Sequence, residues 1–376
     1  MPDVLIFADS VRSPELRHEV PLAVPDTFLY AEHGGERHVV VASFELDRIK
    51  ELGGDLQLHP FEELGLDDLY EQGLSREQLD LELNLAAARR FGIERAVVPA
   101  DFPLELADYL RANGIDLTPD RDFFVARRRV KNEDELAGIK RAQQGAEAGM
   151  AVVRDMLRRA DRSDGTLTLD GDPLTCERIH VAVEQAFSEH GVAAEDFIVS
   201  HGAQTAVGHD TGSGPIAPGE PVLADLFPRD RESGCYTDMT RTFVAPGADD
   251  ATAAELREYQ RLCRDALERV LEAVRPGASG RDLHRIACDI FHEHGYPTQL
   301  SKKPGEVLES GFYHGLGHGV GLEVHEQPWL SRAPGELVAG DVIATKRAPS
   351  CSAYRNGSGI ETGTSCRISA DLIVSA

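Results

Sequence analysis

Three histidines and four glycines lie close together in the stretch FYHGLGHGVGLEVHEQP, residues 312–328. They are His314, His318 and His325, with Gly315, Gly317, Gly319 and Gly321. Histidine is the commonest metal ligand and changes charge near neutral pH, and glycine lets the backbone approach a ligand or take positive φ. We therefore expect this stretch to carry a chemical site. The alternative is a glycine-rich loop whose histidines are incidental.

Two aspartates lie in short segments that alternate like strands. Asp225 belongs to PVLADLF at 221–227 and Asp238 to CYTDMTRTFV at 235–244, with a turn at 229–234 between them. A carboxylate in an apolar strand is costly unless it is paired. If the two strands pair antiparallel through the turn, the carboxylates come side by side, and a divalent cation is the usual remedy for their repulsion. The alternative is a salt bridge to Arg229 or Arg241.

These residues form a set of metal ligands when His318 and a later glutamate are added. Mixed oxygen and nitrogen ligands suit Mn, Co, Zn or Fe. Two such ions about 3.5 to 4 Å apart would hold a hydroxide as nucleophile and polarise a carbonyl oxygen. His209, in GHDTGSGP, and His314 and His325 would then be donors around the reacting carbonyl.

The elements that must position this set fall into two parts. Residues 1–128 are predicted to form a small α/β unit. It has a strand at 4–8, a hairpin within 27–42 that turns at 33–36, helices near 76–91 and 103–113, and a strand at 95–99. The isolated histidines of this part form no catalytic cluster.

The second part, 129–376, begins with a long helix. Asn132 is its expected N-cap, with Glu135 three residues on, and the helix continues to about Arg159. A second helix ends near His190 and strands follow; two more helices, about 250–274 and 279–294, precede the histidine stretch. This part therefore has two similar halves, each with two helices followed by strands.

Composition excludes several classes of function. The net charge is −25, from 64 acidic and 39 basic residues, so nucleic-acid binding is not expected. A surface this acidic fits a protein that stays folded and dispersed in high salt. The six cysteines form no CxxC pair, which indicates free thiols in a reducing cytosol. We find no signal peptide and no apolar run of about 18 residues, so we expect a cytoplasmic protein without a membrane span.

Four motifs together resemble a known family. PVLADLF, YTDMTRTF, HGLGHGVGLEVHEQP and VKNEDELAGIKRA are similar in order and spacing to the pita-bread metallopeptidases, specifically their Xaa-Pro aminopeptidase and Xaa-Pro dipeptidase branch. The resemblance covers the whole chain. It implies an α+β fold with a pita-bread catalytic domain of two pseudo-symmetric halves at 129–376. A smaller α/β domain like that of creatinase and prolidase would precede it at 1–128, and the chain would form a homodimer.

The resemblance also implies roles for individual residues. Two divalent ions, Mn or Co first and Zn or Fe next, would be held by ligands that include Asp225, Asp238 and His318. His209, His314 and His325 would match the histidines that position the peptide and stabilise the tetrahedral intermediate. The spacing of thirteen residues between the two aspartates is slightly longer than in many relatives.

The carboxyl-terminal end, 345–376, departs from the family pattern. DVIATKRAP places Lys346 where the family has a ligand glutamate, and an ammonium group cannot ligate a cation. GIET keeps Glu361 as a further metal ligand but has Gly359 in place of an arginine. One hypothesis is a reading-frame slip before Lys346, because the codons for Thr345–Ala348 permit Glu-Ala-Gly when read from the third base of Thr345.

The predicted function is therefore hydrolysis of the bond before proline in peptides or dipeptides by a metal-activated hydroxide. Two alternatives stay open. One is a creatinase-like hydrolase of another amide or amidine. The other is a catalytically impaired pita-bread protein that only binds, as Lys346 would favour.

Overall fold

The computed structural model describes residues 2–347 and 368–374. For residues 346–347 and 368–374 it describes the backbone alone. The chain divides into two compact units. The first contains Met1–Arg128 with Glu232–Gly234, and the second Arg129–Arg231 with Cys235–Ala376. Among the described residues, no helix is both long enough and apolar enough to cross a bilayer.

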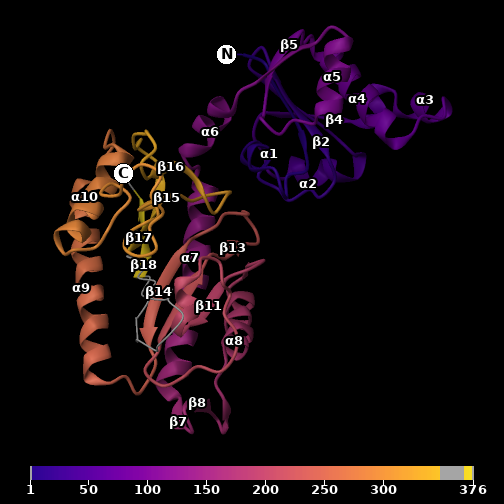
Figure 1. The fold of residues 1–376 in the computed structure, drawn as a ribbon. Helices are drawn as coiled ribbons and strands as arrows, with labels where there is room; N and C mark the ends of the chain where they lie inside the picture. The colour runs from indigo at the N-terminus through magenta and orange to yellow at the C-terminus, as the bar shows by residue number, and fades with distance from the viewer. Residues whose placement is uncertain (1, 348–367, 375–376) are drawn as a thin grey trace. The chain divides into compact units, whose positions relative to one another are not determined.

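The first unit, drawn in indigo and violet in Figure 1, is built on a six-stranded sheet. The strand order is β4-β3-β2-β1-β5-β6. Its strands are β1 (Val4–Ala8), β2 (Phe28–His33), β3 (Glu36–Val41), β4 (Leu56–Pro60), β5 (Arg95–Val98) and β6 (Asp116–Pro119). Its helices are α1 (Pro14–Glu19), α2 (Leu46–Lys50), α3 (Leu66–Glu71), α4 (Arg76–Phe91), α5 (Leu104–Ala112) and α6 (Arg121–Arg129). The alternation of strands and helices predicted for this part is confirmed.

The predicted hairpin joins β2 to β3. His33 pairs with Glu36, and the turn between them is Gly34 and Gly35 at φ of 61° and 90°. Glycine reaches these positive values without a steric penalty, which explains why the chain reverses within two residues.

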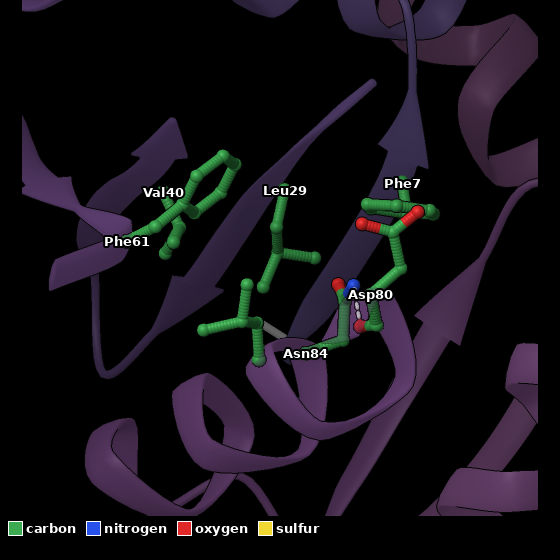
Figure 2. A pocket seen from close by; sticks show the side chains of 7 residues that line it. Phe7, Leu29, Val40, Phe61, Asp80 and Asn84 are labelled. Atoms are coloured by element: carbon green, nitrogen blue, oxygen red, sulfur yellow. Dashed lines mark hydrogen bonds between the residues drawn. The ribbon is translucent and has the colours of Figure 1, made fainter. Parts of the chain in front are cut away.

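A small pocket lies between this sheet and α4 (Figure 2). Its walls are mostly apolar, with two polar residues of α4, and they comprise Phe7, Leu29, Val40, Phe61, Leu83, Asp80 and Asn84. Asn84 Nδ2 donates to the carbonyl of Asp80 at 2.7 Å, whereas Asn84 Oδ1 is buried and accepts no hydrogen bond from the described residues. Burial also raises the pKa of Asp80. The helix therefore turns two acceptor groups toward an apolar space.

The second unit opens with the predicted long helix, α7 (Glu133–Arg159). Asn132 caps it, and Glu135 completes a capping box by accepting from the Asn132 amide at 3.0 Å. A small sheet of β7 (Asp161–Ser163), β8 (Thr166–Leu169) and β9 (Asp172–Pro173) leads to α8 (Cys176–Glu189), which packs beside α7. The central sheet of this half has the order β11-β12-β14, with β11 at Ile198–His201, β12 at Pro221–Leu226 and β14 at Met239–Val244.

The second half repeats the predicted order of two helices and then strands. Helices α9 (Asp250–Ala273) and α10 (Gly280–Glu293) pack on each other, capped by Asp249 and Ser279. The sheet that follows has the order β16-β15-β17-β18, with β15 at Gly317–Gly319, β16 at Glu326–Leu330, β17 at Val342–Arg347 and β18 at Ile368–Val374. Strand β18 lies against β14, so the sheets of the two halves adjoin (Figure 1).

Candidate metal centre

His318 lies at the middle of β15, a strand flanked on both sides. It pairs with Trp329 of β16 and with Ala344 of β17. The two neighbouring glycines allow this close packing, because a Cβ on Gly317 would lie 2.1 Å from the Ala344 carbonyl oxygen and one on Gly319 would lie 2.1 Å from that of Gln327.

The reason we expected for the glycines is therefore wrong for these two positions. Neither Gly317 nor Gly319 has positive φ, and both crowd against neighbouring strands of their own sheet. Their role is to let three strands meet closely around the histidine.

The ring of His318 has a defined orientation. Its Nδ1 donates to the Gly319 carbonyl at 3.0 Å, which leaves a lone pair on Nε2 in the neutral ring. That Nε2 lies 3.1 Å from Asp238 Oδ2 and makes no hydrogen bond within the described part of the chain. Two such atoms at this distance repel each other unless a proton on Nε2 or a metal ion lies between them. This pair of atoms therefore fits a metal ion.

His325 completes a cluster with these two residues. Ligand atoms of Asp238, His318 and His325 all lie within 4.8 Å of one another, and the two imidazole rings are 4.3 Å apart at 89°. The side chains of Asp238 and His318 are only 2% and 7% exposed, whereas His325 is exposed. One carboxylate and two imidazoles suit Mn, Co, Zn or Fe. The cluster has a buried side and a side open to solvent.

Asp238 reaches this position from just outside a strand, contrary to the expected strand at 235–244. Strand β14 begins at Met239. The residues before it leave the β12 ladder, because the Tyr236 amide donates to the Gly321 carbonyl at 2.7 Å. Asp238 is therefore tied to the loop that carries the histidines.

Asp225 and Asp238 are not directly opposite each other, although the expected strand pairing forms. Strands β12 and β14 do pair antiparallel, but Asp225 lies opposite Thr240. Thr240 Oγ1 donates to Asp225 Oδ1 at 2.6 Å, so the carboxylate is buried with a defined orientation. Asp225 is not a member of the Asp238–His318–His325 cluster.

Neither of the other two predicted histidines belongs to this cluster. His314 is half-buried, and its Nδ1 donates to the Gly315 carbonyl at 2.7 Å. His209 is exposed on a loop with φ of 64°. Glu361 lies outside the described residues. The backbone of Lys346 belongs to β17, where it pairs with Ala370.

Sequence reasoning missed one buried ion pair near the cluster, between Lys131 and Glu326. Its two side chains are 2% and 6% exposed. The available signal was the glutamate directly after His325, a charged residue at the start of a short strand.

Comparison with known proteins places the second unit in a family. Residues 137–376 match the model of metallopeptidase family M24. The chain is 28% identical over 265 residues to the Xaa-Pro dipeptidase of Pyrococcus horikoshii, an alignment that covers 69% of this chain and 66% of that protein. It is 27% identical over 219 residues to the Xaa-Pro dipeptidase of Pyrococcus furiosus, over 57% of this chain and 54% of that one. The matches thus span between about half and two thirds of these relatives' length.

Solved structures share the fold over the full chain. The prolidase from P. horikoshii matches with a TM-score of 0.69 at 22% identity and covers 100% of this chain and 91% of that one. The X-Pro aminopeptidase from Thermotoga maritima matches with a TM-score of 0.70 at 19% identity, over 100% of this chain and 91% of that one. These likenesses confirm the predicted fold, a pita-bread catalytic part preceded by an α/β part. The chain belongs to metallopeptidase family M24.

Proposed function

We propose that this chain hydrolyses the bond before proline in short Xaa-Pro peptides or dipeptides, with two divalent cations as cofactors. The observation that carries the proposal is the cluster of Asp238, His318 and His325, in which the Nε2 atom of His318 lies 3.1 Å from a carboxylate oxygen. Relatives at 27% and 28% identity that are named Xaa-Pro dipeptidases support the substrate class. When bound, divalent ions would supply a hydroxide nucleophile at neutral pH and polarise the peptide carbonyl.

The protein groups have separable tasks in this proposal. Asp238 and His318 bind cations, and the Nδ1–H bond to Gly319 holds the His318 ring in the ligating orientation. Asp225 is a further ligand whose carboxylate is oriented by Thr240, and Glu361 remains a proposed ligand from the sequence. His325, on the exposed side of the cluster, would meet the substrate and exchange a proton with it. His209 and His314 are proposed to position the peptide.

The domain boundaries and the assembly are also proposed. We propose domains at 1–128 and 129–376, a homodimer and a cytoplasmic location. Light scattering coupled to size exclusion would measure the dimer, and fractionation of the native cells would locate the protein.

Metal content and hydrolysis test the proposal together. The metal-free protein is loaded in turn with Mn²⁺, Co²⁺, Zn²⁺ and Fe²⁺, the bound ions are counted by mass spectrometry, and Xaa-Pro dipeptides, Xaa-Pro-Yaa tripeptides and creatine are offered. Asp238→Ala should abolish metal loading at this cluster. Asp155→Ala, on the exposed face of α7, is the matched control. Retained stoichiometry in Asp238→Ala would remove that residue from the ligand set.

The outcome also separates the candidate functions. Hydrolysis of creatine but of no Xaa-Pro peptide would favour a creatinase-like enzyme. A protein that binds Xaa-Pro peptides without cleaving them would favour the impaired binding protein. The sequence observation behind this second candidate is Lys346, which lies in β17 two residues beyond Ala344, the partner of His318.

A further inference from the structure

The ion pair of Lys131 and Glu326 joins two segments that lie 195 residues apart in the sequence. Lys131 directly precedes Asn132, the N-cap of α7, whose backbone amide is held by the capping box. Glu326 is the first residue of β16 and directly follows His325. The pair therefore connects the beginning of the longest helix to the residue next to an exposed histidine of the cluster.

The pair is buried, and burying two charges is expensive. The Lys131 Nζ atom contacts Glu326 Oε1, with side chains 2% and 6% exposed. Taking both charges out of water offsets much of their attraction, so a buried pair is a weak source of stability. A buried pair is more readily explained as a feature that favours one arrangement of the chain over others.

The ion pair can fix the conformation of the loop between Gly321 and Glu326. A Cβ at Gly321 would lie 2.7 Å from Lys131 Nζ and 2.9 Å from Glu326 Oε1, so the ion pair packs directly on the Gly321 backbone. Gly321 does not have positive φ, so a side chain there would meet no backbone strain but would force the ends of Lys131 and Glu326 to shift.

The same loop is held from a second side. The Tyr236 amide donates to the Gly321 carbonyl at 2.7 Å, and Tyr236 lies two residues before Asp238. The loop is thus fixed between the Asp238 segment and the Lys131–Glu326 pair. Its last residue, His325, is held with its ring 4.3 Å from that of His318.

From this geometry we propose that Lys131 and Glu326 are positioning residues, which act through the 321–326 loop to hold His325 against Asp238 and His318. The proposal rests on the proposed function only in treating the cluster of Asp238, His318 and His325 as a metal site. Neither Lys131 nor Glu326 is assigned contact with a metal or a substrate. Outer residues that orient a metal site typically change metal affinity about 10- to 100-fold when they are replaced.

Four variants test the proposal. Lys131→Met breaks the pair, and Gly321→Ala displaces it sterically while both charges remain. The double variant with Lys131→Glu and Glu326→Lys reverses the pair and keeps the connection. Lys303→Met, an exposed lysine in the same unit, is the matched control.

The readouts are the Co²⁺ dissociation constant and the visible absorption spectrum of the Co²⁺-loaded protein, with thermal unfolding as a check on folding. Because the Tyr236 amide ties the same loop to the Asp238 segment, we expect Lys131→Met and Gly321→Ala to weaken Co²⁺ binding about tenfold or more and to change the spectrum. The reversed pair should recover most of the affinity, and Lys303→Met should match the wild type. Folded Lys131→Met and Gly321→Ala proteins with wild-type affinity and spectrum would overturn the proposal.

Hydrogen exchange of residues 319–326 in the metal-free protein separates this proposal from the proposed function. We expect faster exchange there in Lys131→Met and no change in Lys303→Met, and unchanged exchange would contradict the proposal even if the wild type bound no Co²⁺. A wild type that binds Co²⁺ but cleaves no Xaa-Pro peptide would overturn only the proposed substrate.

Discussion

His284 should make this protein sensitive to acid. It lies on α10 with 0% exposure, its ring 5.4 Å from that of Phe312, and its Nε2 lies 3.5 Å from the Cys288 thiol. Burial, with a smaller contribution from the Arg332 charge, lowers the pKa of His284 from its ordinary 6.5 to about 4. The folded state therefore keeps this imidazole neutral over a pH range in which the unfolded chain is protonated.

The sign and size of the effect follow from this difference. Because the folded pKa is the lower one, stability is fully present above pH 6.5 and is lost as the pH falls toward 4. A tenfold change in proton affinity corresponds to about 1.4 kcal/mol, so the loss is about 2 kcal/mol between pH 7.5 and 5 and about 3 kcal/mol by pH 4.

The assay compares urea unfolding of the wild type and His284→Leu at pH 7.5, 6 and 5. Trp329, the one tryptophan of the sequence, lies in the second unit and reports its unfolding by fluorescence. The variant should lose about 2 kcal/mol less than the wild type between pH 7.5 and 5. His292→Leu, exposed on the same helix, should behave as the wild type. Equal losses in His284→Leu and wild type would refute the reasoning.

Three further predictions concern other parts of the molecule. Asn84→Leu should raise the free energy of unfolding of the first unit by about 1 kcal/mol, because it removes a buried acceptor that bonds to none of the described residues, and urea unfolding measures this. Lys346→Glu should raise the bound metal toward about two ions per chain, counted by mass spectrometry; unchanged stoichiometry would mean that residue 346 is no ligand position. Raising KCl from 0.05 to 1 M should stabilise a chain of net charge −25 by on the order of 1 kcal/mol or more, and a salt-independent urea midpoint would contradict the halophilic interpretation.

Much of the local structure could be predicted because its causes are local. Asn132 and Glu135 cap α7, Ser279 caps α10, and two adjacent glycines make the β2–β3 turn, as expected from the residue types alone. Such features depend on hydrogen bonds and backbone freedom within a few residues. The order of two helices followed by strands in both halves could be predicted from local signals of the same kind.

The strand register near the site could not be predicted in the same way. Alternation of residue types shows which residues share a face of β12, but the opposite residue depends on how the chain leaves the sheet between the strands. Here β13 (Arg229–Asp230) pairs with β10 (Val192–Ala193). Consequently Thr240, and not Asp238, lies opposite Asp225.

The sequence by itself determined which aspartates and histidines are candidates for the site, their order and their family resemblance. These properties depend only on residue identity and spacing. Only the tertiary structure decided which of them meet, since Asp238 lies in a segment far along the chain from His318 and His325. It also decided why the glycines are needed and that Lys131 reaches Glu326 across 195 residues. Contacts of this kind produce no periodic pattern of residue types in the sequence, because they depend on how whole helices and strands pack.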